Sequence, residues 1–393
     1  MTDAQPLWRH SLPTAILLMA PFDLLASLAM DIYLPVVPSM PEQLGSSPAV
    51  IQLSLSLYLL GLGLGQAAFG PLSDRFGRRP VLLGGALTFA LASACLAVAN
   101  DGWTFVVLRT MQALGAAAAL VATFATVRDV YGEREESTRI YGLFSSMLAF
   151  VPALGPMIGA LVSEQLGWRS LFWLLAILTV APLLHALARW KESRPAYAAR
   201  VPSAGPILRS RNFQLYTLAF GTGMGAFFVY FSTAPRLLIG QAGLSELQFS
   251  LAFASTAVVM IVTSQLSRGL LREWGVAGAV QRGMGLLLAS SLCYAAASGT
   301  GSPTIWSVVL PSWLMAIGIV LTVSVTANGA LAEFADRAGL AVALYFAGQS
   351  IVVSLIGTAA IVMLGGETIW PLVACTAVLP VAVLIGLNRR KQG

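Results

Sequence analysis

Long apolar segments alternate with short polar ones along almost the whole chain. Twelve such segments can be distinguished, and a polar stretch at 189–211 separates the first six from the last six. They cover residues 12–36, 49–71, 80–100, 104–127, 140–163, 168–188, 213–239, 247–268, 275–298, 304–327, 340–364 and 368–387. Each is close to the roughly 20 residues that a helix needs to cross a bilayer. The pattern predicts an all-α polytopic membrane protein with twelve transmembrane helices.

The amino-acid composition also indicates a helical membrane protein. Of the 393 residues, 57% are hydrophobic and only 10% are charged, whereas soluble domains carry about 25% charged residues. The mean hydropathy of +0.79 agrees with a membrane protein, and apolar runs of this length exclude a transmembrane β-barrel. We therefore expect an N-terminal six-helix bundle at 1–188, a cytoplasmic basic linker at 189–211 and a C-terminal six-helix bundle at 212–393.

The net charge of +6 is distributed unevenly between the two sides of the predicted membrane. Most cations fall on one side of the membrane: those of the linker together with Arg75, Arg78, Arg79, Arg128, Arg134, Arg139, Arg268, Arg272, Arg337, Arg389, Arg390 and Lys391. The only cations on the other side are Arg169 and Arg236. Cytoplasmic loops carry the excess of Lys and Arg, so we expect both termini to be cytoplasmic. This distribution also argues against nucleic-acid binding.

Histidines, cysteines and an apolar N-terminal segment could suggest a metal site, disulfides or a signal peptide, but the sequence does not support these interpretations. His10 and His185 are too few and too far apart for a metal site, and the three cysteines lie singly in apolar segments. The first apolar segment is interrupted by Asp23 and has no clear small-residue cleavage site, so it reads as a retained helix and not as a signal peptide. We expect no metal and no cofactor.

The two halves show a weak repeat with an offset of about 200 residues. The first segment ends DIYLPVV and the seventh ends FSTAPRLL, while the loop DRFG at 74–77 corresponds to REWG at 272–275. Duplicated halves with a site near the midplane are a known transporter design. Since the last six segments contain no mid-membrane acid or base that we can identify, we expect the proton chemistry to lie in the first half.

Two carboxylates, Asp23 and Asp31, lie within the first apolar segment. A charge at mid-bilayer costs roughly 2.5–3.5 kcal/mol on insertion scales, and such residues usually serve ion or proton pathways. Eight residues of helix place the two about 80° apart around the axis and about 12 Å apart along it. Both can therefore face one cavity, and we predict that they carry protons in a proton-driven transporter.

The loop between the second and third segments has the most specific motif. It reads Gly70-Pro71-Leu72-Ser73-Asp74-Arg75-Phe76-Gly77-Arg78-Arg79-Pro80. We expect Gly70 to permit close approach of helices, Gly77 to make a tight turn and Pro80 to fit a first helical turn. Asp74 can cap a helix or pair with an arginine, and the arginines suit an anionic membrane face. The alternative interpretation is an ordinary basic loop.

Two further motifs lie inside apolar segments. Arg109 begins Arg109-Thr110-Met111-Gln112, and its predicted depth matches that of Asp31, which makes the two a natural ion pair. Alternatively, Arg109 is a structural arginine that reaches the membrane surface. The fifth segment carries Pro152, Gly155, Pro156 and Gly159. Small residues let helices pack closely and proline introduces kinks, so plain packing is the alternative here.

These motifs resemble those of the major facilitator superfamily. The loop at 70–80 matches its loop signature, which implies a role in gating: it would latch the two halves in the outward-open state. Arg109-x-x-Gln112 resembles the R-x-x-Q-G signature of proton-coupled members, with Ala113 in place of the first glycine. The fifth segment resembles the antiporter signature G-P-x-x-G-G, with Ala160 at the last glycine.

The resemblance is closest to bacterial drug–proton antiporters of the Bcr/CflA group, which share the D-x-Y-L-P-x-x-P that begins at Asp31. The motif Arg128-Asp129-Val130-Tyr131 fits the same group. The alternative interpretation is that this motif is only a solvated helix end. Segments such as LLMAPFDLLASLAMDIYLPVVPSM and VSVTANGALAEF resemble the chloramphenicol and florfenicol exporters. This resemblance implies export of phenicols across a bacterial inner membrane in exchange for protons, by a monomer embedded in the lipid bilayer.

Within that interpretation, Asp23 is the candidate for drug contact and shared protonation, and Asp31 with Arg109 for the proton switch. Tyr33 and Tyr230 are candidates for the substrate pocket, although most aromatic residues in membrane helices serve packing. Alternatives are a broader multidrug–proton antiporter and, less favoured, a proton-coupled importer of a nutrient. A membrane enzyme lacks support because no H-E-x-x-H and no G-x-S-x-G on a strand–helix turn occurs. A membrane sensor lacks an added soluble domain.

Overall fold

A computed structural model describes Trp8 and residues 11–131, 135–194, 203–299, 303–334 and 338–392. Within these ranges the chain forms helices and no strands, which confirms the predicted all-α fold. Two predicted loop cations, Arg134 and Arg337, lie outside the described residues, as do residues 195–202 of the predicted linker.

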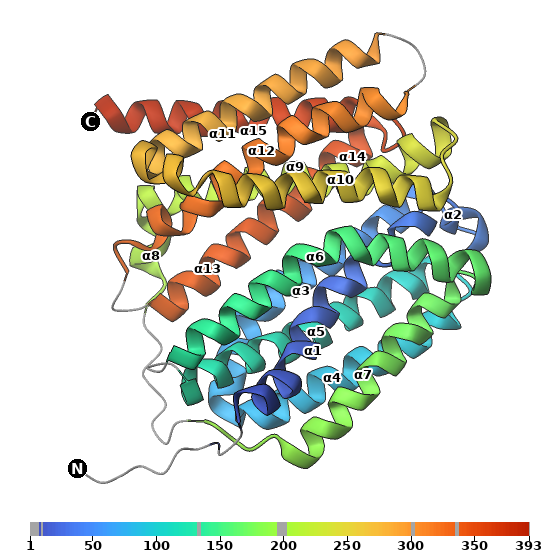
Figure 1. Ribbon diagram of the computed structural model, residues 1–393, viewed down its shortest axis with the longest axis vertical. Coiled ribbons are helices and arrows are strands. Elements are labelled where there is room, and N and C mark those ends of the chain that lie inside the picture. Colours follow the sequence, from blue (N-terminus) through green and yellow to red (C-terminus); the bar gives the residue numbers. More distant parts are fainter. Residues whose placement is uncertain are drawn as a thin grey trace. The chain divides into compact units, whose positions relative to one another are not determined.

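Fifteen α-helices follow one another along the described chain (Figure 1). Their bounds are α1 (Leu12–Asp31), α2 (Met40–Gln43), α3 (Pro48–Phe76), α4 (Arg78–Ala97), α5 (Gly102–Tyr131), α6 (Glu135–Leu166), α7 (Arg169–Arg189), α8 (Gly205–Arg209), α9 (Arg211–Pro235), α10 (Glu246–Leu266), α11 (Arg268–Ser298), α12 (Ile305–Leu331), α13 (Ala338–Ile351), α14 (Thr358–Leu364) and α15 (Trp370–Gln392). Short irregular turns extend three of them: η1 (Leu34–Val36) is a 3₁₀-helix, while η2 (Arg236–Gln241) and η4 (Val352–Gly357) are π-helices.

The predicted membrane spans agree with these helices. Within the described residues, eleven helical segments are long and apolar enough to cross a bilayer. The remaining predicted span falls in α6, whose apolar part is the shorter stretch Phe150–Leu166. The pattern of apolar segments therefore located every membrane helix of the described chain.

The chain folds into two compact units. Unit 1 contains Met1–Tyr33 and Leu57–Val201, and unit 2 contains Leu34–Ser56 and Pro202–Gly393. The segment Leu34–Ser56, which includes α2 and the beginning of α3, thus belongs with the later helices. The domain boundaries proposed from the sequence, at 188 and 212, stay a prediction.

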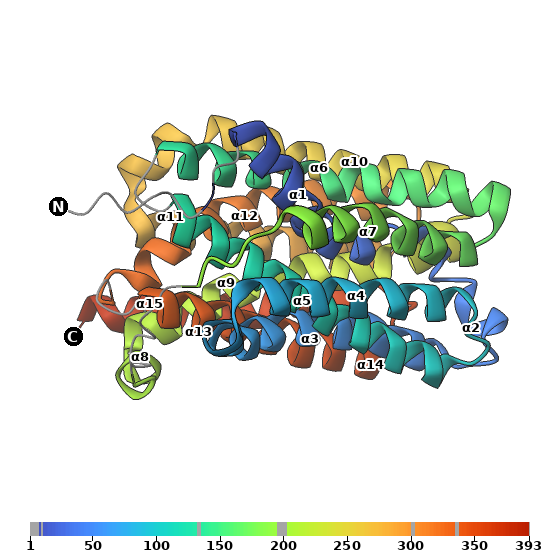
Figure 2. The same cartoon turned by 90° about the horizontal axis from the view of Figure 1, so that it is seen from below.

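In unit 1, α4 packs along both α5 and α7, while α1 packs against α5, α6 and α7. Figure 2 shows α4 and α5 side by side. Glycine makes this approach possible, because a Cβ on Gly85 would lie 2.7 Å from the carbonyl oxygen of Gly115. Helices can approach this closely only where a side chain is absent.

In unit 2, α9 is the central helix and packs against α12, α13, α15 and η4. The segment Leu34–Ser56 is joined to it by two hydrogen bonds. Gln52 donates to the Ser232 hydroxyl at 3.2 Å, and Arg236 donates to the carbonyl oxygen of Pro48 at 3.1 Å. These contacts anchor the first turns of α3 in unit 2.

The corresponding loops of the two halves share a backbone feature. Gly77 separates α3 from α4 with a φ of +108°, and Gly275 interrupts α11 with a φ of +63°. Both values lie in a region that favours glycine, so the expected tight turn at Gly77 is confirmed. The expectation for Gly70 is wrong, because a Cβ there would meet nothing within 4 Å. Pro80 lies in the first turn of α4, as expected.

Candidate functional site: buried charges of unit 1

Both predicted acids of the first span are buried in α1. Asp23 is 1% exposed and Asp31 is 6% exposed. One carboxylate oxygen of Asp23, Oδ2, has no hydrogen-bond partner in the part of the chain that the structure describes. Asp31 is the last residue of the α-helix, and its backbone continues into the 3₁₀ turn that contains Pro35. Because Asp31 lies where the α-helix gives way to irregular backbone, its side chain can lie beside residues of neighbouring helices.

Arg109 is fully buried in α5, about two turns from the helix start. Its Nη1 donates to the carbonyl oxygen of Ala29 in α1 at 3.0 Å and to Oε1 of Gln112 at 2.5 Å. Its Nε and Nη2 have no hydrogen-bond partner among the residues of the described ranges. A buried donor without a partner costs free energy, so the edge formed by Nε and Nη2 is available for an acceptor.

Two tyrosine rings enclose the Arg109 guanidinium. Its central carbon lies 4.5 Å from the ring centroid of Tyr33 and 4.2 Å from that of Tyr58. Cation–π contacts of this kind strengthen where water is excluded. The Tyr58 hydroxyl also donates to the carbonyl oxygen of Ala26 at 2.7 Å, which ties α3 to α1. Tyr33, predicted near the substrate, thus contacts the predicted proton-coupling arginine.

The predicted ion pair between Arg109 and Asp31 is not formed in this structure. Within the described residues, neither Arg109 nor Asp31 takes part in an ion pair within 4 Å. Arg109 instead uses Nη1 on the α1 backbone and on Gln112, which in turn donates to Ser93 of α4 at 2.7 Å. Spacing placed both charges at a similar depth but could not determine the direction in which the guanidinium extends.

The glycines of the predicted antiporter signature lie against the end of α1. A Cβ on Gly155 would lie 2.9 Å from the Cβ of Asp31, and one on Gly159 would overlap the carbonyl oxygen of Ile32. Pro152 and Pro156 both lie inside α6. This face of α6 therefore holds the backbone around Asp31 in close contact, and any added side chain would displace it.

The predicted gating loop contains a second group of charges. Arg78 is 2% exposed and pairs with Asp74 at 2.5 Å and with Asp129 of α5 at 2.8 Å. It also donates to the Ser73 hydroxyl at 2.8 Å. The expectation that all arginines of this loop face the membrane surface is wrong for Arg78. The alternative of a solvated helix end is wrong for Asp129, whose side chain is 5% exposed.

Sequence reasoning missed Glu192, which follows α7. Its carboxylate accepts the backbone N–H groups of Arg78 at 2.8 Å and of Arg79 at 3.2 Å, at the start of α4. A carboxylate is stabilised at a helix N-terminus. Nearby, Arg194 donates to the carbonyl oxygen of Arg75 at 2.6 Å. No local pattern indicates this cap, because the capping residue lies more than 100 positions along the chain.

Tyr230, the other predicted substrate residue, lies in α9 of unit 2 and is fully buried. Its hydroxyl lies 3.2 Å from that of Thr256, which lies 2.9 Å from that of Ser312. Its ring stacks on Phe253 with centroids 5.4 Å apart. Within the described residues no group of three or more His, Cys, Asp or Glu could hold a metal ion.

Comparison with known proteins agrees with these features. The family described as Major Facilitator Superfamily matches residues 22–358. A "Chloramphenicol resistance protein" of Pseudomonas aeruginosa is 46% identical over 379 residues, which cover 96% of this chain and 90% of that protein. A "Multidrug resistance protein MdtL" of Shewanella oneidensis is 29% identical over 319 residues, or 80% of each chain. Another protein of that name, from Escherichia coli O157:H7, is 28% identical over 323 residues.

Proposed function

We propose that this chain, which belongs to the Major Facilitator Superfamily, exports phenicol antibiotics from the bacterial cytoplasm in exchange for protons. The family consists of transporters, so the chain is a transporter and not an enzyme. The phenicol substrate is supported by the relative named for chloramphenicol resistance. The relatives named for multidrug resistance support a second candidate, a broader drug–proton antiporter.

The observation that carries the proton-coupled mechanism is the set of incompletely paired charges in unit 1. Asp23 and Asp31 are buried and have no ion-pair partner among the described residues, and Arg109 is buried with two guanidinium nitrogens that find no acceptor there. An anchor or a passive wall has no use for such groups, because each carries a large insertion cost. Protons are the coupling ion, and no further cofactor is required.

Within this proposal, Asp31 and Arg109 act as the proton switch. When Asp31 is deprotonated, its carboxylate is attracted to the open Nε–Nη2 edge of Arg109, which matches a carboxylate bidentately. When Asp31 is protonated, that attraction is lost and Arg109 keeps its contacts with the α1 backbone and the two tyrosines. Asp23 contacts the drug and shares the protonation.

The transport cycle follows from mutual exclusion between drug and proton. With the acids deprotonated and accessible from the cytoplasm, the drug binds, with Tyr33 and Tyr230 contributing to its site. The site is then exposed to the opposite side, where protons neutralise the acids and displace the drug. Each ligand weakens the binding of the other, and this coupling is reciprocal. An uncharged drug exchanged for one proton moves net charge, so export responds to the membrane potential as well as the pH gradient.

The loop at 70–80 controls this alternation. Its glycines, Gly70 and Gly77, and its charges, Asp74, Arg75, Arg78 and Arg79, form the predicted gate at the cytoplasmic side. The network of Arg78 with Asp74 and Asp129 can form or break as helices move, because Asp74 is 53% exposed. The protein acts as a monomer in the inner membrane, with both termini in the cytoplasm.

The direct test measures accumulation of chloramphenicol and florfenicol in a susceptible bacterial strain that expresses the chain. We expect lower accumulation than in cells without the protein, and a protonophore abolishes the difference. Unchanged accumulation of both drugs, with the protein present in the membrane, would contradict the phenicol assignment. Raised accumulation would instead favour an importer, and export of unrelated amphiphilic drugs would favour the multidrug candidate.

A matched pair of substitutions tests the acids. Asp23→Asn is expected to abolish resistance while the protein remains in the membrane. Asp101→Asn is the control, because Asp101 is exposed and caps α5 by accepting the backbone N–H of Thr104 at 2.8 Å. The hydrogen bonds with Thr104 lower the pKa of Asp101, so this control also removes a negative charge. Full resistance with Asp23→Asn would exclude Asp23 as an essential group.

A second test separates two roles for Arg109. Arg109→Ala alone is expected to stop transport. If Arg109→Ala combined with Asp31→Asn restores transport, Arg109 serves only to neutralise the acid. A double variant that stays inactive agrees with the proposal, in which transport needs both Asp31 and Arg109.

A further inference from the structure

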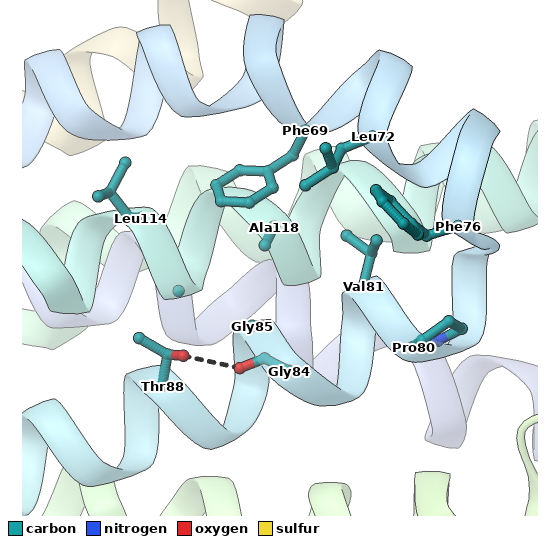
Figure 3. Close-up of a pocket in the computed structure, with 11 residues that line it drawn as sticks. Phe69, Leu72, Phe76, Pro80, Val81, Gly84, Gly85, Thr88, Leu114 and Ala118 are labelled. Atoms are coloured by element: carbon teal, nitrogen blue, oxygen red, sulfur yellow. Dashed lines mark hydrogen bonds between the residues drawn. The ribbon is translucent and has the colours of Figure 1, made fainter.

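A groove of ≈ 380 Å³ that is not enclosed lies between α3, α4 and α5 of unit 1 (Figure 3). Phe69, Leu72 and Phe76 of α3 form one wall, Val81 of α4 faces them, and Leu114 of α5 closes one end. Leu72 is 41% exposed and Phe76 is 58% exposed. The groove is therefore accessible from the medium that surrounds the helices.

A glycine pair in α4 shapes the floor of this groove. Gly85 is used for packing, because a Cβ there would lie 2.7 Å from the Ala118 side chain. Gly84 is not needed for helix packing, because a Cβ there would meet nothing within 4 Å. Glycine in a helix interior is destabilising relative to alanine by roughly 0.5–1 kcal/mol. Gly84 therefore keeps space open without serving a helix contact.

The chemistry of the groove excludes water as its occupant. Among its lining residues only Thr88 has a polar side chain, and its hydroxyl already donates to the carbonyl oxygen of Gly84 at 2.8 Å. An enclosed water needs about 2–4 polar partners, which this lining does not offer. All three helices are apolar enough to span a bilayer, so the surrounding medium is hydrocarbon and an acyl chain fits the groove.

A cation lies at one end of the groove. Phe76 and Pro80 line it where α3 turns into α4, and Arg75 places its guanidinium carbon 5.4 Å from the centroid of the Phe76 ring. Arg75 is exposed and forms no ion pair with any described residue, whereas neighbouring Asp74 is paired with Arg78. Arginines at the membrane surface attract anionic phospholipids.

We propose that this groove binds one acyl chain of an anionic phospholipid, whose phosphate lies at Arg75. The apolar wall and the space above Gly84 receive the chain, and the exposed guanidinium selects a negatively charged head group. Since the groove ends at the loop that carries the Gly70–Pro80 motif, the bound lipid supports the position of this loop. Lipid binding in this groove does not depend on which drug is transported.

The test measures lipids that stay bound to the purified full-length protein by native mass spectrometry, with phosphatidylglycerol and phosphatidylcholine as probes. Gly84→Leu places a side chain in the groove, with no neighbour within 4 Å of the new Cβ. Gly285→Leu is the matched control, because it also lies in a membrane helix with open space around its Cβ. We expect Gly84→Leu to lose one tightly bound phosphatidylglycerol and Gly285→Leu to keep it.

Equal lipid retention by both leucine variants would overturn the proposal. Gly84→Ala serves as a smaller change if the leucine variant does not reach the membrane, and it is expected to weaken the same lipid to a lesser degree. Displacement of the lipid by chloramphenicol would also contradict the proposal, because the groove would then be a drug site.

The head-group assignment has its own test. Arg75→Gln is expected to reduce the preference for phosphatidylglycerol over phosphatidylcholine by about fivefold, the contribution typical of one cation near an anionic surface. Arg272→Gln removes an exposed arginine of α11 and should leave the preference unchanged. Wild-type protein that binds both lipids equally, or an Arg75→Gln variant that keeps the full preference, would refute the role of the phosphate.

Discussion

The interiors of the two units differ in the kind of polar group that they bury. Unit 1 buries Asp23, Asp31, Arg78 and Arg109, and several of their polar atoms have no partner. Among the described residues of unit 2, Arg236 is the only buried charge, and the polar core consists mainly of hydroxyl groups. A buried acid can change its charge by taking up a proton and a hydroxyl group does not, so this difference supports the proposal that proton chemistry lies in unit 1.

Most buried hydroxyl groups of unit 2 donate to backbone carbonyl oxygens, as Thr233 and Thr322 do, and a few contact one another. Tyr230, Thr256 and Ser312 form one chain of contacts, and the hydroxyl groups of Thr326 and Tyr345 lie 2.8 Å apart. Each hydroxyl group with a partner helps to fix the core around it, and none of these groups changes its charge by taking up a proton. We infer that the described part of unit 1 is built to change its charge state and that the described part of unit 2 is not. Four substitutions test the roles of these buried groups and of the packing around them.

The largest effect is expected for Asp31→Asn. It removes the titratable group beside Gly155 and should lower drug export by roughly 5- to 150-fold, the range of typical coupling free energies. The measurement is drug efflux from energised cells at equal protein levels. Ser312→Ala in unit 2 is the comparison variant. If Ser312→Ala reduced export as much as Asp31→Asn, the inferred functional difference between the interiors of the two units would be wrong.

The next effect concerns stability. Arg78→Ala removes the nearest partner of the Asp129 side chain, which is 5% exposed, and leaves it only Arg128 at 3.5 Å. Breaking a buried pair from one side costs about 3–5 kcal/mol, so the midpoint of thermal unfolding in detergent should fall markedly. Asp74→Asn is the matched control, because Asp74 is 53% exposed and exposed pairs contribute about 0–1 kcal/mol. Equal losses in the two variants would show that burial does not determine the strength of this network.

A smaller loss is expected for Gly159→Ala. The new methyl group would overlap the carbonyl oxygen of Ile32 and separate α6 from α1. Overpacking of this kind costs about 1–3 kcal/mol. Gly142→Ala lies in the same helix, where the methyl group meets nothing within 4 Å, and should not destabilise the protein. Chemical or thermal unfolding of the two variants measures the difference, and a stable Gly159→Ala protein would contradict the close contact.

The smallest effect is expected for Tyr230→Phe. It removes one hydroxyl, while Thr256 keeps its contact with Ser312. A single hydrogen bond contributes about 0.5–1.5 kcal/mol to stability, and drug export should fall less than in the Asp31→Asn variant. The same unfolding and efflux assays measure both values. Complete loss of export would show that the hydroxyl group of Tyr230, and not only its ring, is essential for transport.

Part of the site could be predicted because its information is local. Asp23, Asp31 and Arg109 are conspicuous in apolar segments, since a charge inside a membrane helix is expensive. Gly77 was predictable because a tight turn between two helices needs a residue that tolerates positive φ. The partners of these residues were not predictable. Asp129 and Glu192 read as solvent-exposed residues near helix ends, and nothing near them in sequence indicates Arg78 or α4.

The sequence by itself determined the class of protein, the number of membrane segments and the identity of the buried charges. Each of these follows from hydropathy, which acts on a segment of about 20 residues whatever its neighbours are. Only the tertiary structure decided that Arg109 bonds to the α1 backbone between Tyr33 and Tyr58, and not to Asp31. The choice depends on the packing of α1, α3 and α5, because a buried guanidinium is directed by the acceptors and rings that distant segments bring to it.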